Sequence, residues 1–192
     1  LDSNKCESVD VKKNGKGIFK YSGGVLINGI WKNGKLLKGK MVDTYLDETY
    51  IGSFKDNLKH GTGTLHMEDG SWYKGSWKSD MRHGEGEFHW PSGSCYKGMH
   101  ALDERNGFGV LYSNTGRIRF KGNWKDGKGH GKGEYHWEDG HYHTGLYENG
   151  KAQGEGMYYL TYTIMITPGL DAKFIQEYLR CDGFPGTSIN NI

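Results

Sequence analysis

The sequence is poor in residues that mark several common protein classes. Of its 192 residues only three are proline, at positions 91, 168 and 185, so polyproline and collagen-like chains are excluded. The three cysteines, Cys6, Cys95 and Cys181, are widely spaced and form no CxxC pair. This pattern argues against a disulfide framework and favours a reducing, intracellular compartment.

The chain also lacks a long apolar run and a strong excess of charge. No segment approaches the roughly 20 apolar residues that a membrane-spanning helix needs, and no secretory signal pattern is visible. The formal net charge is +2, which gives no reason to expect nucleic-acid binding. The charge is uneven, however, because residues 11–42 contain lysines but no aspartate or glutamate.

Recognisable catalytic motifs are missing as well. No GxSxG, HExxH or paired Cys/His set occurs. The glycine-rich stretch 127–133 superficially resembles a phosphate loop, but Lys132 is followed by glycine where that loop needs serine or threonine. The acidic residues lie at solvated repeat positions and not in an apolar pocket that would shift a pKa. We therefore expect no enzyme activity and no cofactor.

Glycine and aromatic residues are abundant together. Glycine supplies 32 residues and aromatics 14% of the chain, whereas disordered chains are poor in aromatics. A glycine in the pattern aromatic-x-Gly-x-aromatic recurs every 23 or 24 residues, at positions 29, 52, 75, 98, 122 and 145. A Gly-x-Gly pair begins nine residues after each of the last five, and a further pair at 15 and 17 belongs to a half repeat. Such fixed spacing indicates a repeat architecture.

Each repeat is interpreted as two β-strands. The segment Tyr73-x-Gly75-x-Trp77 alternates with a period of two, and the second strand runs from the Gly-x-Gly pair to residues such as Phe88 and Trp90. Asx-Gly turns such as 69–70 and 139–140 supply the positive φ that tight hairpins need. The sequence therefore predicts an all-β fold over residues 14–160. It is an elongated single-layer antiparallel solenoid with a half repeat and about six 23-residue repeats.

Alternation assigns the two faces of this sheet. Tyr73, Gly75 and Trp77 share one face, and Lys74 points to the other. Glycines beside aromatics let large rings lie over bare backbone, and stacked hairpins supply contacts that a single hairpin lacks. We expect the ring face to form an aromatic-glycine groove that holds a helix or peptide of a partner protein. Its candidate contact residues are Trp31, Tyr50, Phe54, Tyr73, Trp77, Phe88, Trp90, Tyr96, Phe120, Trp124, Tyr135, Trp137 and Tyr147.

The pattern Tyr-x-Gly-x-Trp/Phe-x-x-(Asn/Gly)-x-x-His-Gly-x-Gly resembles the MORN motif (membrane occupation and recognition nexus). It recurs six times over about residues 14–160. The sequence departs from it where His100 occupies an aromatic position, where Asn106 and Gln153 replace the histidine, and where His143 replaces the leading tyrosine. The resemblance implies a curved solenoid with a groove and a scaffold role, as in ciliary spoke heads, cytoskeletal collars and junctophilins, or beside kinase and methyltransferase domains. It also implies a possible contact with acidic lipids.

Outside the array the sequence predicts a C-terminal cap. Residues 1–13 are an N-terminal segment. Residues 161–167 are a strand candidate, and Thr167-Pro168 begins a short amphipathic helix over about 169–181 that Gly183 ends. The cap, 161–182, would cover the last strand edge or, alternatively, dock a partner, and residues 183–192 form a loose tail.

A second candidate site is the lysine-rich N-terminal part of the array. Its residues are Lys12, Lys13, Lys16, Lys20, Lys32, Lys35, Lys38 and Lys40. They are expected to contact an acidic protein or an anionic lipid surface, where each lysine contributes about 1 kcal/mol; the alternative is a solvated face. Strand alternation predicts that the lysines are split between two faces, so that about half act together.

The histidines suggest no comparable site. His60, His83 and His130 repeat with the motif and are interpreted as structural turn contacts. His136, His141 and His143 flank Asp139 and imitate a metal site, but they lack a second ligand pair, so no metal is expected.

Two classes of function remain. In the first, the chain is a non-enzymatic scaffold within a larger cytoskeletal, ciliary or membrane-associated assembly, and truncating Trp77 and Trp124 should abolish partner capture without unfolding. In the second, it is a membrane-surface module, the targeting part of a larger enzyme, that depends on the lysines. A homo-oligomer through the open edge of the half repeat is a further expectation.

Overall fold

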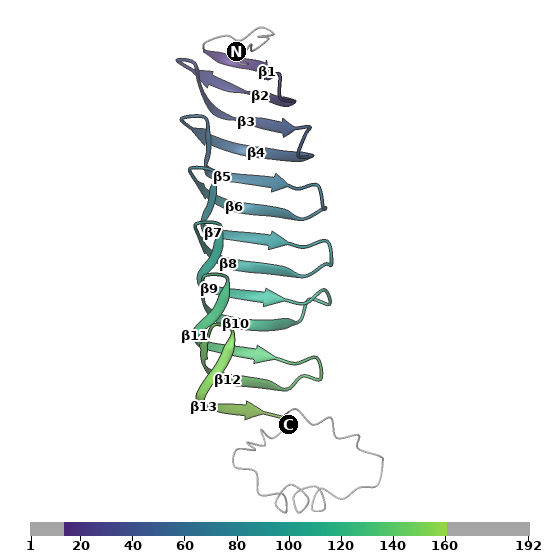
Figure 1. Cartoon of the computed structure of the whole chain (residues 1–192), viewed down its shortest axis with the longest axis vertical. Helices are drawn as coiled ribbons and strands as arrows, with labels where there is room; N and C mark the ends of the chain where they lie inside the picture. The colour runs from purple at the N-terminus through teal and green to yellow at the C-terminus, as the bar shows by residue number, and fades with distance from the viewer. Residues whose placement is uncertain (1–13, 161–192) are drawn as a thin grey trace, which may run out of the picture. The chain divides into compact units, whose positions relative to one another are not determined.

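The computed structural model describes residues 14–160 of the chain, which form one antiparallel sheet of 13 strands (Figure 1). Each strand pairs with its neighbours in the sequence, from β1 to β13 without a crossover. The strands are β1 (Gly15–Lys20), β2 (Val25–Lys32), β3 (Lys35–Asp43), β4 (Glu48–Lys55), β5 (Leu58–His66), β6 (Trp72–Lys78), β7 (Met81–His89), β8 (Cys95–Ala101), β9 (Glu104–Tyr112), β10 (Ile118–Lys125), β11 (Lys128–His136), β12 (Tyr142–Glu148) and β13 (Lys151–Tyr159). The predicted all-β antiparallel fold is confirmed.

A two-residue turn joins the two strands of every repeat. In the β6–β7 turn Ser79 and Asp80 have φ values of 51° and 68°. Two successive residues with positive φ make a type I′ turn, whose twist matches that of the flanking strands. The β10–β11 turn achieves the same geometry with Asp126 and Gly127, at 49° and 72°.

Neighbouring tight turns are also linked to one another. The carboxylate of Asp80 accepts a hydrogen bond from the backbone N–H of Lys59 in the preceding repeat at 2.7 Å, and the Asp80 N–H donates to the Lys59 carbonyl at 3.0 Å. Asp103 makes the same pair of contacts to Arg82, at 2.9 and 3.2 Å. Each turn is therefore fixed by the repeat before it.

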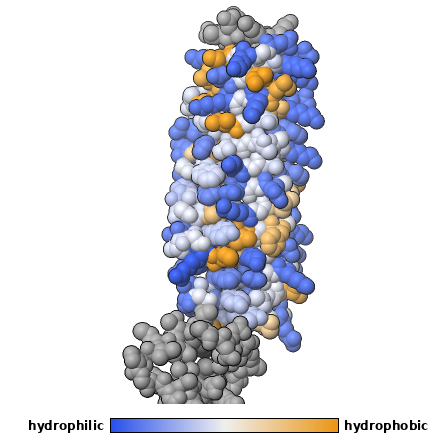
Figure 2. Space-filling view, turned by 180° about the vertical axis from the view of Figure 1, so that it is seen from behind, coloured by the Kyte–Doolittle hydropathy of each residue, from blue (hydrophilic) through white to orange (hydrophobic). Residues whose placement is uncertain are grey.

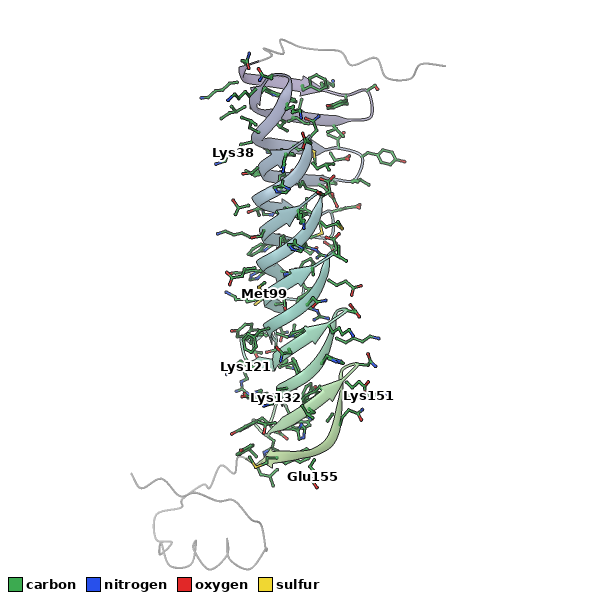
Figure 3. All side chains as sticks on the ribbon, turned by 90° about the vertical axis from the view of Figure 1, so that its left-hand side faces the viewer. Lys38, Met99, Lys121, Lys132, Lys151 and Glu155 are labelled. Carbon is green, nitrogen blue, oxygen red and sulfur yellow. The ribbon has the colours of Figure 1, made fainter. Side chains whose placement is uncertain are left out.

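Every hairpin that a tight turn closes contains a β-bulge between its glycine pair and that turn. In the β6–β7 pair Gly75 lies opposite Gly86 and Trp77 opposite Arg82, so a step of two residues on β6 matches a step of four on β7. Bulges bend the strand that carries them and increase its twist. Repeated along the array, they curl the sheet toward the side that bears the rings. Figure 3 views the array from the side of the tight turns, where the strands bend.

The curl gives a single sheet a hydrophobic core. Buried side chains form one cluster from Ile27 to Trp77 and a second from Tyr96 to Tyr147. No helix within residues 14–160 is long and apolar enough to cross a membrane. The predicted cap helix, the strand candidate at 161–167, and the segments 1–13 and 183–192 lie outside the described residues.

Candidate partner-binding groove

Most of the ring face is an interior and not an open groove, and a pocket of about 460 Å³ opens on it beside Trp90, Arg105 and Leu111. Three of the thirteen predicted groove residues, Phe88, Trp90 and Tyr135, are half-buried, and Trp137 is 40% exposed. The others are buried: Trp31, Tyr50, Phe54, Tyr73, Trp77, Tyr96, Phe120, Trp124 and Tyr147. The structure thus brings the predicted residues together, but it places most of them where solvent and a partner do not reach.

The leading tyrosine of three central repeats determines how this core packs. The Tyr73 ring lies over Gly75 and Gly86, and its hydroxyl donates to the carbonyl of Ser76 at 3.0 Å. Burial raises the pKa of Tyr73 to about 12, so the phenol stays protonated and remains a donor. Tyr50 and Tyr96 make the same contacts in their own repeats.

Edge-to-face ring contacts join one repeat to the next. The Trp77 ring is 5.3 Å from that of Tyr50 in the preceding repeat and 5.2 Å from that of Tyr73 in its own. Trp77 Nε1 also donates to the Gly63 carbonyl at 3.2 Å, a bond that Trp124 repeats with Gly109. These rings hold repeats together, which is what stacked repeats need for stability.

His100 fills a tryptophan position at the junction of the two core clusters. It is only 3% exposed and lies edge-on to the rings of Tyr73 and Tyr96, each 5.1 Å away. Its Nδ1 lies 3.2 Å from the carbonyl of Gly98 on its own strand. Burial, reinforced by Arg82, lowers the pKa of His100 to about 4, so the ring is neutral at pH 7.

A groove runs along the opposite face of the sheet, which we call the outer face. One part of about 880 Å³ extends over β3–β9, and a second of about 470 Å³ extends over β9–β13, with Phe108 lining both. Its floor is the backbone of the glycine pairs, because glycine offers no side chain on either face. Figure 3 shows Lys38, Met99, Lys121 and Lys132 in succession down this side of the array.

The outer face carries exposed apolar side chains that the alternation pattern does not predict. Phe108 is 54% exposed and Leu146 is 52% exposed, and Met99 and Met157 line the groove beside them. In Figure 2 apolar groups gather at two levels among charged ones, over the N-terminal strands and again in the lower half of the array. A protein that exposes aligned apolar groups in a groove has a surface suited to a partner.

A comparison of the repeat copies reveals these residues in the sequence. Phe108 stands between the two glycines of its Gly-x-Gly pair, where other copies have Thr62, Glu85 or Lys132. Leu146 follows the glycine of aromatic-x-Gly-x, where Ser76 stands in the clearest copy. An apolar residue at a position that is polar in several other copies is the signal, and a search for rings alone misses it.

The described lysines of the N-terminal site all lie on the outer face. Lys16 and Lys38 both pair with Ile30, Lys20 with Leu26, Lys40 with Asn28, and Lys35 with Lys32. These partners are alternate residues of β2, on the face opposite the buried Ile27 and Trp31. For these six lysines the expectation of two faces is therefore wrong, because the bulge in β3 inserts a residue between Lys35 and Lys38, which returns Lys35 to the face of Lys38 and Lys40. Lys12 and Lys13 lie outside the described residues.

Histidines near residue 140 are separated by the sheet. His143 is buried on the ring face, with its Nδ1 2.7 Å from the Tyr147 hydroxyl. His136 instead stacks on Tyr142 at 5.1 Å on the outer face, and His141 lies 3.7 Å from Asp139. Within the described part of the chain no group of three or more His, Cys, Asp or Glu side chains is arranged to hold a metal ion.

Comparison with known families agrees with this geometry. The family described as MORN repeat matches residues 50–72, 73–95, 120–142 and 143–161. The chain carries MORN repeats. Between the matched MORN repeats, residues 96–119 form the β8–β9 hairpin in which His100 replaces the tryptophan. Residues 14–49 form MORN-like hairpins that the family pattern does not match. No curated protein matches the chain.

Proposed function

We propose that this MORN-repeat chain is a non-enzymatic scaffold that binds a helix or peptide of a partner protein along the outer-face groove. The observation that carries the proposal is the pair of exposed apolar side chains, Phe108 and Leu146, that line one continuous groove. Burial of such anchors supplies most of the binding energy in protein interfaces. The rings on the other face act as the rigid support.

The proposal moves the partner site away from the aromatic core. Truncating Trp77 or Trp124 is a poor test of binding, because both are buried and link repeats. An acidic substitution in the groove is a better one, since Phe108 and Leu146 are more than half exposed and their replacement leaves the core intact.

The experiment is co-purification of partners from the source cells with the full chain and with Phe108→Asp/Leu146→Asp. The matched control is Leu102→Asp, because Leu102 is 70% exposed in a tight turn and outside the groove. We expect proteins that co-purify with the parent chain and the control to be lost from the double variant, which should keep its circular dichroism spectrum and melting temperature. Retention of every partner by a folded double variant contradicts the proposal.

The scaffold would serve a cytoskeletal, ciliary or membrane-associated assembly inside the cell. This part of the proposal is supported by the roles typical of MORN-repeat proteins and by the lack of a catalytic motif in the sequence. Proximity labelling with the full chain tests it, and enrichment of secreted or lumenal proteins alone would argue against it.

An acidic membrane surface is a second candidate ligand, favoured by the lysines of β1–β3. Lys16, Lys38 and Lys40 share a face with Ile18 and Ile30, which are exposed between them. Exposed apolar groups surrounded by lysines suit a membrane interface, where burial and charge act together. Residues 14–42 contain no acidic side chain to oppose this attraction.

Flotation of the full chain with vesicles containing phosphoinositides tests this second function. Reversal of Lys16, Lys38 and Lys40 to glutamate should abolish flotation. Reversal of Lys125, Lys128 and Lys151, at the other end of the array, should leave it unchanged. Binding that never occurs, or that survives the first set of substitutions, rejects a lipid-binding role.

A further inference from the structure

The groove over β9–β12 alternates between apolar and basic contacts. Phe108 on β9 and Leu146 on β12 are its exposed apolar side chains. Lys121 on β10 and Lys132 on β11 lie on the two strands between them. Register places Lys132 directly opposite Leu146, and Phe108 opposite Asn123. Lys121 lies two residues from Asn123 on the same face of β10, opposite Val110.

The two lysines are available to a ligand. Both are exposed, and no ion pair involving them is found among residues 14–160. Glu134 lies across from Lys121, but its carboxylate is 3.5 Å from Nε2 of His136. Glu155 is the other acidic side chain in this stretch and lies on the last strand, beyond Leu146. The two lysines outnumber Glu134, so the centre of the stretch carries a net positive charge between apolar ends.

The spacing of the strands matches the pitch of an α-helix. Neighbouring strands are about 4.8 Å apart, and one helical turn rises about 5.4 Å. A helix laid along the array therefore places about one turn over each strand. An extended chain repeats its side chains on one face about every 6.7 Å, which does not match the strand spacing. From Phe108 to Leu146 there are three strand steps, about 14 Å, and three helical turns span about 16 Å, so a tilted helix covers them.

We propose that this stretch binds an amphipathic helix of a partner protein that is acidic in the middle of its binding face. Apolar residues at i and i+11 would contact Phe108 and Leu146, and Asp or Glu at i+4 and i+7 would face Lys121 and Lys132. All four positions lie on one side of a helix. The inference rests on the proposed scaffold function and adds the chemistry of its partner.

The test uses two labelled 20-residue helical peptides and the full chain. Both peptides carry leucine at i and i+11 in an alanine and glutamine background; one has glutamate and the other lysine at i+4 and i+7. Fluorescence anisotropy should show that the parent chain binds the acidic peptide at least about tenfold more tightly, a difference equivalent to about 1.4 kcal/mol. The variant Lys121→Glu/Lys132→Glu should reverse the preference.

The charge is reversed both in the chain and in the peptide. A variant that had lost its fold would bind neither peptide, whereas a direct contact requires the variant to gain affinity for the basic peptide. Equal binding of both peptides by the parent chain, or an unchanged preference in the variant, overturns the inference. If the inference fails but Phe108→Asp/Leu146→Asp still removes cellular partners, the scaffold proposal stands without an acidic helix as the partner. Two other results would also overturn the inference. If Lys121→Glu/Lys132→Glu abolishes flotation on anionic vesicles, the lysines bind lipid. If it abolishes self-association in analytical ultracentrifugation, they bind a second copy of the chain.

Discussion

The ring of Tyr73 lies across Gly86 on the next strand. A Cβ added to Gly86 would be less than 3.0 Å from atoms of this ring, so the ring would have to move. The tyrosine is fully buried and edge-on to Trp77 and His100, so it has no free space to move into. The glycine therefore serves here to leave room for the ring. The same relationship links Tyr50 to Gly63 and Tyr96 to Gly109.

Replacement of Gly86 by alanine should destabilise the array by about 1–3 kcal/mol, because the added methyl group overpacks a closed core. Gly86 does not have positive φ, so the effect is steric and not a matter of backbone strain. Gly23→Ala is the control, since a Cβ there meets nothing within 4 Å, and its effect should stay within about 0.5 kcal/mol. Urea unfolding followed by tryptophan fluorescence measures both, and equal midpoints for the two variants would contradict the packing argument.

Substitutions of Asp80 should separate the backbone and side-chain roles of the tight turns. Asp80→Asn keeps an acceptor for the Lys59 N–H and should cost little. Asp80→Gly loses that bond, at about 1 kcal/mol, but accepts the φ of 68°, as glycine does at the matching positions 127 and 150. Asp80→Ala loses the bond and also strains the backbone, for a further cost of about 1 kcal/mol or more. Thermal melting should rank the variants in this order, and an alanine variant as stable as the glycine variant would show that the φ is unimportant.

His100 should make the array sensitive to acid. Its pKa is lowered in the fold to about 4 from a usual value of 6.5, so the unfolded chain binds the proton first as the pH falls. The stability that depends on neutral His100 is complete above about pH 6.5 and is lost progressively toward pH 4. The full loss is about 3 kcal/mol, from the size of the shift.

Unfolding free energies of the parent chain and of His100→Trp between pH 7 and pH 4 measure this contribution. The substitution restores the residue found at position 77 and removes the titrating group, so the variant should lose less stability over this interval. Arg82 and Arg105 also disfavour the protonated ring, while Asp103 favours it. Parallel pH profiles for the two proteins would exclude His100 as the cause.

Truncation of Trp77 should unfold the array rather than remove a contact with a partner. Trp77→Ala deletes a buried ring and its bond to the Gly63 carbonyl, and large aromatic truncations in cores cost about 3–5 kcal/mol. Trp137→Ala removes a ring that is 40% exposed and should cost less than about 1 kcal/mol. Calorimetry compares the two, and a Trp77→Ala protein as stable as the parent would mean that the rings are not the core.

Part of this molecule follows directly from local sequence. The alternation of Tyr73, Gly75 and Trp77 and the Gly-x-Gly pairs led to the strands and their antiparallel order. Asp126-Gly127 is an Asx-Gly turn of the expected kind, but Leu102-Asp103 adopts the same φ values without a glycine. That turn depends on the contacts between Asp103 and Arg82 of the preceding repeat, which no short-range pattern contains.

The candidate site was only partly predictable. The prediction placed the partner groove on the rings, and it had no means of recognising that a single sheet can bury one of its own faces. It also divided the lysines of β1–β3 between two faces, because alternation counts residues and takes no account of the extra residue in the β3 bulge. Phe108 and Leu146 were overlooked because they stand at positions that are polar in several other copies and do not extend the ring pattern.

The amino-acid order alone determined the alternation of the strands, the Asx-Gly turns and which glycines meet rings, since these depend on neighbours within one repeat. Only the tertiary structure decided which face meets solvent. That outcome depends on bulges that curl successive hairpins in one direction until Tyr50, Trp77 and Tyr73 enclose one another. Burial is a property of many repeats together, so the surface left open for a partner appears only when they are stacked.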